Sequence, residues 1–148
     1  MLTIVLGAVI LAVAAFLAAR YWSGGSAAYD RIALATPCDL RSGACEQSAV
    51  GGSVRLSIAP ADLPLMKPLQ MSVQLRDLDA ESVQVAMRGL NMDMGLNITR
   101  LRRIGDGSWQ GETILPICSQ RRMEWEAAVM VDGIRRFEVA FPFHTERP

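Results

Sequence analysis

Short runs of alternating apolar residues follow one another through the chain after residue 50, and turn residues separate them. Clear runs lie at 54–58, 69–75 and 83–87. Such alternation places successive side chains on opposite faces of a strand, whereas a helix would repeat every three or four residues. No long stripe with helical spacing occurs after residue 22. This part of the chain is therefore predicted to be mainly β.

The remaining runs fit hairpins. Runs at 97–104 and 109–114 flank a Gly-Asp-Gly turn, and the last two runs flank Asp132-Gly133, a pair that suits a tight hairpin turn. Three prolines between residues 60 and 68 remove ladder donors, so this link should cross between sheets or follow an edge. About seven strands in about a hundred residues predict an immunoglobulin-like antiparallel β-sandwich, with a small barrel as the alternative.

The chain begins with an uncharged apolar run from Leu2 to Ala19. As a helix it would extend roughly 27 Å, close to the thickness of the bilayer hydrocarbon. Tyr21 and Trp22 follow, where interfacial aromatic residues belong. A cleaved signal peptide is the alternative, although the run is long for one and no basic segment precedes it. We expect a transmembrane anchor at 1–22, a linker at 23–50 and the β-domain at 51–148.

The spacing of the three cysteines helps to predict the cellular compartment in which the β-domain lies. Cys38 and Cys45 lie at the ends of a short polar loop that a disulfide could close. Because disulfides persist in oxidising compartments, this bridge would place the β-domain in the periplasm and leave Cys118 as an odd thiol. Three reduced cysteines, or a bridge that includes Cys118, are the alternatives, and Arg20 after the apolar run favours a cytoplasmic domain. We expect the Cys38–Cys45 bridge and a single-pass protein of the bacterial inner membrane with a periplasmic domain.

Composition excludes several classes of function. Fifteen basic and fifteen acidic residues are interleaved and give no net charge, so a nucleic-acid-binding surface is not expected. His144 is the one histidine, and the chain has neither a Gly-x-Ser-x-Gly motif nor a phosphate loop. An enzyme needs a general base, an activated nucleophile or an open metal site. We therefore expect no catalysis and no small-molecule substrate.

Sulfur-bearing side chains form the candidate site. Met92 and Met94 lie two residues apart in a glycine-bounded segment, so both would share one face if the segment is extended. Cys118 and Met123 flank a later turn and could converge across it. Thioethers and thiolates suit copper(I), which predicts a copper(I) site. The alternative is that the methionines fill gaps in packing, and for Met66 in the proline-rich link we favour packing beneath the loop.

Two segments carry a resemblance to a known group. The runs NMDMGLNITRL and GSWQGETILPICSQRRMEWEAAV resemble single-span bacterial proteins with a small periplasmic β-sandwich, the FixH-like and YtkA-like domains. The resemblance covers roughly residues 50 to 143 and implies a role in cytochrome oxidase assembly and copper handling. The matched residues are Met92, Met94, Cys118 and Met123. The chain lacks the paired histidines and the His-x-Met element of better-known periplasmic copper chaperones.

Two functions follow as expectations. In the first, the domain binds copper(I) and delivers it to a respiratory oxidase or its assembly factors at the membrane. In the second, it is a metal-free accessory or assembly subunit that docks a membrane complex through its β-sandwich, since a sheet edge can accept a further strand.

Overall fold

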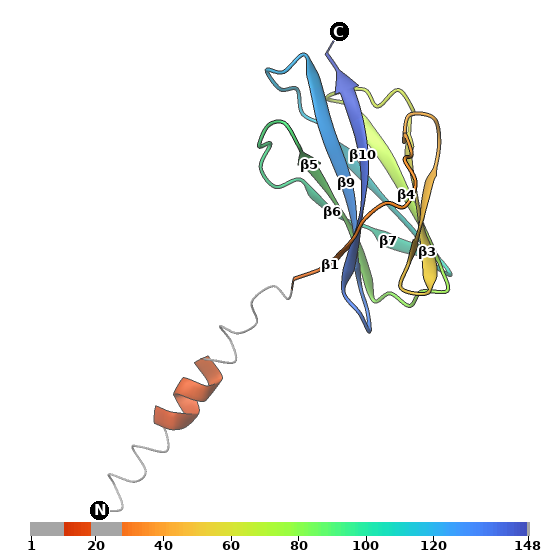
Figure 1. Ribbon diagram of the computed structural model, residues 1–148. Coiled ribbons are helices and arrows are strands. Elements are labelled where there is room, and N and C mark those ends of the chain that lie inside the picture. Colours follow the sequence, from red (N-terminus) through yellow and green to blue (C-terminus); the bar gives the residue numbers. More distant parts are fainter. Residues whose placement is uncertain (1–10, 19–27, 148) are drawn as a thin grey trace, which may run out of the picture.

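The computed structural model describes residues 11–18 and 28–147 (Figure 1). Within the second range the chain forms ten strands in two five-stranded sheets, so the prediction of a mainly β fold is confirmed. The strands are β1 (Asp30–Ile32), β2 (Cys45–Ala49), β3 (Gly52–Ala59), β4 (Pro68–Arg76), β5 (Ser82–Gly89), β6 (Ile98–Arg100), β7 (Arg102–Gly105), β8 (Ser108–Ile114), β9 (Arg122–Asp132) and β10 (Phe137–Glu146).

The two sheets give a β-sandwich-like arrangement. One sheet has the order β1-β10-β9-β5-β6 and the other has the order β2-β3-β4-β8-β7. Neighbouring strands are antiparallel except for β1, which runs parallel to β10 with Asp30 beside Phe137. The long strands of the two sheets overlap in Figure 1.

The described residues form ten strands, whereas the alternation of apolar residues predicts about seven. The run at 97–104 divides into β6 and β7 at Leu101, whose buried side chain marks the crossing from one sheet to the other. The other additional strands, β1 and β2, lie at 30–32 and 45–49, within the segment expected to be linker. Both are short and lack alternating large apolar residues, so periodicity could not reveal them. The sheets thus begin before residue 51.

The apolar residues that alternate in the sequence fill one core between the sheets. Trp125 and Phe141 are the largest fully buried side chains. The Trp125 indole Nε1 donates a hydrogen bond to Thr145 Oγ1 at 2.9 Å, and its ring stacks on Phe143 at 6.3 Å between centroids. Trp109 is also buried, and the Arg103 guanidinium lies over its ring. Both tryptophans therefore belong to the core.

Cys38 and Cys45 form the predicted disulfide, with a Cα–Cα distance of 5.8 Å. The bridge joins Cys38, in the connection between β1 and β2, to Cys45, the first residue of β2. Cys45 and Leu40 are fully buried. Cys118 is a free, half-buried thiol.

The expected anchor at 1–22 falls largely on residues 1–10 and 19–22, outside the described residues. Residues 11–18 are helical with exposed side chains. Among the described residues, no helix has both the length and the apolar character needed to cross a bilayer.

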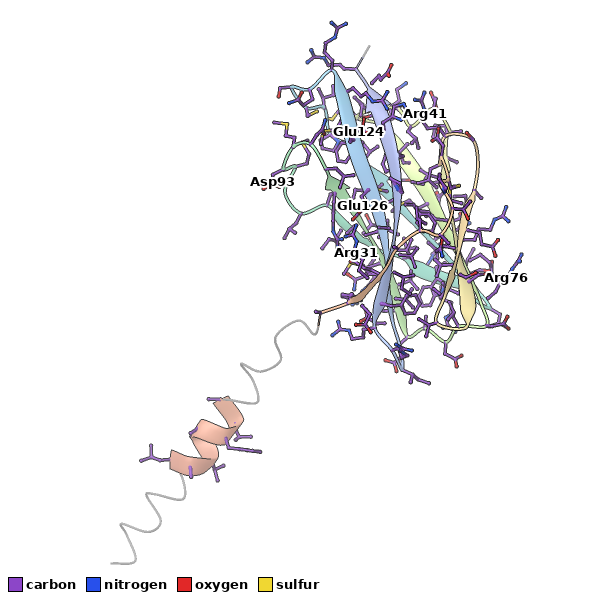
Figure 2. The ribbon with its side chains drawn as sticks, in the orientation of Figure 1. Arg31, Arg41, Arg76, Asp93, Glu124 and Glu126 are labelled. Carbon is purple, nitrogen blue, oxygen red and sulfur yellow. A yellow bond between two sulfur atoms is a disulfide. The ribbon has the colours of Figure 1, made fainter. Side chains whose placement is uncertain are left out.

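The outer face of the β1-β10-β9-β5-β6 sheet carries an ionic network. Glu126 and Glu138 lie on either side of a row of three buried alanines, Ala86, Ala128 and Ala140, which are paired across β5, β9 and β10. Arg88 binds Glu138 at 2.8 Å and Glu126 at 3.3 Å, and Arg31 contacts the same two carboxylates. Because each guanidinium reaches both carboxylates, the two arginines cover the alanine row. Arg31 and Glu126 are marked in Figure 2.

Candidate functional site

Three loops and the end of β10 meet at one end of the sandwich, which we call the loop end. The loops are 60–67, 90–97 and 115–121. Residue pairing places them together, because Pro68 lies beside Ile114, Gly89 beside Trp125, and Glu146 beside Arg122. The start of β1 lies near the opposite end (Figure 1).

The first turn of the 90–97 loop is fixed to β9 by three hydrogen bonds. Leu90 N donates to the Glu124 carbonyl oxygen at 2.8 Å. The Asn91 side chain donates to the Arg122 carbonyl oxygen at 3.0 Å and accepts from Glu124 N at 3.1 Å. Asp93 and Glu124 are both marked near this end in Figure 2. The Asn91 amide therefore holds the loop against the strand that carries Met123.

Met94 and Met123 lie next to each other over Gly89. A Cβ atom at Gly89 would overlap the Met92 carbonyl oxygen and the Met123 methyl carbon, and would approach Met94 Cγ to 3.0 Å. Met123 is 2% exposed, and Met94 is half-buried against the core. The absence of a side chain at Gly89 thus leaves the space that the Met94 and Met123 side chains share.

Met92 points the other way, toward the 115–121 loop. Its Sδ lies 3.8 Å from Ser119 Oγ, and its side chain is 37% exposed. The neighbouring Cys118 Sγ lies 3.7 Å from the Gln120 carbonyl oxygen. The structure thus brings the four sulfur residues to one end. Met94 and Met123 form an inner pair, and Met92 contacts the loop that carries Cys118 through Ser119.

Met92 and Met94 would share one face only in an extended segment, and this segment bends. Residues 90–92 form a bend, and Asp93 Oδ1 accepts a hydrogen bond from Gly95 N at 2.8 Å. Gly95 has a φ of 70°, which glycine adopts readily. The turn separates the two thioethers into one half-buried donor, Met94, and one exposed donor, Met92.

Several oxygen and nitrogen donors at the loop end already bind one another. Arg122 binds Glu124 at 2.7 Å and Glu146 at 3.5 Å, and the hydrogen bond to Glu124 raises the pKa of Arg122. The imidazole of His144 is in β10, with Nε2 2.9 Å from Arg41 Nη1. Among residues 11–18 and 28–147, no three histidine, cysteine or acidic side chains gather as a metal site. The sulfur atoms that this end does bring together are donors of the kind that copper(I) accepts, whereas magnesium and calcium prefer oxygen.

Met66 lies at the same end of the sandwich. We expected its side chain to pack beneath the loop, and this prediction is wrong. Its side chain is 60% exposed, and its backbone N donates to the Leu115 carbonyl oxygen at 2.9 Å. Leu63 occupies the buried position instead. A leucine has no sulfur, so Leu63 offers no ligand to a metal.

Comparisons with known proteins add no identification. No family model matches the sequence, and neither a curated protein nor a solved structure matches the chain.

The sequence marked Gly89 only as a residue that bounds the segment, and it did not identify the space that Gly89 provides or the contacts of Asn91 and Ser119. An asparagine side chain can bind backbone groups in a turn, which was the available signal for Asn91. The contacts of Gly89 and Ser119 join segments about thirty residues apart, so no local pattern predicts them.

Proposed function

We propose that this protein is a membrane-anchored periplasmic protein that binds or delivers copper(I), in the setting of respiratory oxidase assembly. Met92, Met94, Cys118 and Met123 are the proposed ligands, on an immunoglobulin-like sandwich. The observation that carries the proposal is the meeting of two sulfur-bearing segments at the loop end, where Met94 and Met123 adjoin over Gly89 and Met92 contacts Ser119. Copper(I) accepts such soft donors.

The four proposed ligands differ in their exposure to solvent, and we assign them different roles accordingly. Met94 and Met123 supply thioethers from the buried side, where water competes least for the ion. Met92 is exposed and Cys118 is half-buried, so a partner's ligands would reach the ion from the side of Met92. Delivery then proceeds by exchange of one sulfur ligand at a time, without any change in the oxidation state of copper.

Two further features support the membrane setting. The Cys38–Cys45 disulfide suits an oxidising compartment such as the periplasm. The uncharged run from Leu2 to Ala19 suits a membrane anchor. Because β1 starts near the end opposite the loop end, an anchor ahead of β1 would leave the sulfur residues accessible to a partner.

The proposal is tested by copper(I) titration of the full chain against a chromogenic chelator, without oxygen. We expect about one copper per chain, and loss of this copper in the double variant M92L/M94L. The variant M130L is the matched control, because Met130 is paired with Glu138 and Gln84 in the middle of the sheet. Absence of copper from the wild-type chain, or equal copper in M92L/M94L, would refute the copper proposal.

A metal-free docking function is the second candidate, and exposed apolar residues at the loop end favour it. Leu96 is 94% exposed, and Leu90, Ile98, Ile114 and Ile117 are also exposed. Asn97 joins their two segments, since its side chain donates to the Ile114 carbonyl oxygen at 3.0 Å. Exposed apolar groups that lie together often mark contacts with other proteins. This function predicts no bound copper and co-purification with a membrane complex.

A further inference from the structure

A cleft of about 350 Å³ lies at the loop end, between the proline-rich link, Ile117 and the last residues of β10. Its volume falls near the lower limit of small-ligand sites, which have about 300–1,000 Å³. Arg41, from the disulfide-closed segment, is on its rim and is marked near this end in Figure 2. None of the four proposed copper ligands lines this cleft.

One part of the cleft is apolar and held in place. Leu63, Pro64, Leu65 and Ile117 line it. Leu63 N donates to the Pro60 carbonyl oxygen at 3.1 Å, and Leu63 has a φ of 47°, a conformation that is uncommon outside glycine. The bond from Met66 N to Leu115 ties the link to the 115–121 loop. The apolar surface is therefore formed before any ligand arrives.

The rim carries excess positive charge. Arg41, Lys67 and Arg147 line the cleft, and among the described residues none of the three forms an ion pair with a carboxylate. The acidic residues there are Asp62 and Glu146, and Glu146 is already paired with Arg122 at 3.5 Å. Three cations therefore face two carboxylates, which leaves an excess of one positive charge.

We propose that this cleft binds a small amphiphilic carboxylate, a ligand with one negative charge and a short apolar chain. The chain would lie on Leu65 and Ile117, and the carboxylate would bind Lys67 and the guanidinium groups. Guanidinium groups bind carboxylates through two parallel hydrogen bonds, and Arg41 and Arg147 provide two such groups. This binding does not depend on the copper proposal.

The test uses octanoate as the probe and NMR signals of leucine and isoleucine methyl groups in the full chain. Octanoate is expected to shift the signals of Ile117 and Leu65 to saturation and to leave Ile134 unchanged, because Ile134 lies on another surface. Octanol at the same concentration is expected to shift Ile117 less, because it has the chain without the charge. The variant M92L/M94L should bind octanoate as the wild type does.

Two variants examine the charge and the apolar surface separately. K67Q/R147Q is expected to weaken octanoate binding at least fivefold, because exposed ion pairs each contribute a few-fold. I117D replaces an exposed side chain and should abolish the binding without unfolding the domain. R135Q, which removes an exposed charge on another surface, is the matched control and should bind normally. Equal shifts with octanol, unchanged binding in K67Q/R147Q, or a shift of Ile134 in parallel with Ile117 would overturn the proposal.

Discussion

At the scale of single residues, the sulfur site depends on a position without a side chain. Gly89 ends β5 opposite Trp125, and the Met92 carbonyl oxygen, the Met123 methyl group and Met94 Cγ occupy the space where a Cβ atom would lie. Here glycine is needed for space, since its φ is not in the left-handed region. The two thioethers can adjoin because the strand leaves room for both.

G89A is therefore expected to disturb the site although it removes no sulfur atom. The added methyl group must displace Met123 or the backbone at Met92, and overpacking of this kind costs about 1–3 kcal/mol of unfolding free energy. Urea unfolding should show this loss, and copper(I) titration should show weaker binding. G105A is the control, because a Cβ at Gly105 meets only Ser108 at 3.8 Å. Wild-type stability and copper affinity in G89A would contradict the expectation.

At the scale of elements, the outer face of one sheet is organised by charge. Glu138 is 6% exposed, and the hydrogen bond from Arg88 holds its pKa below the ordinary value for a glutamate. Because the pKa in the folded protein lies below that in the unfolded chain, the ionised carboxylate contributes stability above the unfolded pKa of about 4.3. That contribution is lost as pH falls through the folded pKa.

E138Q is expected to lower the unfolding free energy by about 1–3 kcal/mol at pH 7, since a hydrogen bond to a charged group is lost. The wild-type protein should lose stability as pH falls below about 4.3, and E138Q should lose less over the same range. Thermal unfolding midpoints measured from pH 7 to pH 3 give both quantities. E112Q, at an exposed glutamate on β8, is the control. Parallel pH profiles of E138Q and wild type would exclude this role for Glu138.

The sequence predicted the elements that bury large side chains and missed those that do not. Alternation identified β3, β4, β5, β8, β9 and β10, because each places apolar residues in one core. It missed β1, whose Arg31 faces the network instead of the core. The spacing of Met92 and Met94 was visible in the sequence, but the division into a half-buried and an exposed donor depends on the bend at 90–92. Contacts between distant segments decide such features.

At the scale of the whole molecule, one end of the sandwich holds the sulfur residues, the carboxylate cleft and the segment closed by the disulfide. Arg41 lines the cleft, and Leu40 beside it is fully buried, so the disulfide-closed segment forms part of both the core and the loop end. The bridge between Cys38 and Cys45 and the burial of Leu40 both hold this segment against the sandwich.

The number of titratable thiols is the prediction at this scale. The intact chain, isolated under alkylating conditions that prevent exchange, should show one thiol before reduction and three after it, because Cys38 and Cys45 are bridged and Cys118 is free. C38A/C45A should show one thiol in both conditions and lose about 2–3 kcal/mol of unfolding free energy, the value for closing a short loop. C118A should show none before reduction and two after it. Three thiols in the untreated wild-type chain would mean that the bridge is absent in the cell, and the support for a periplasmic domain would then be lost.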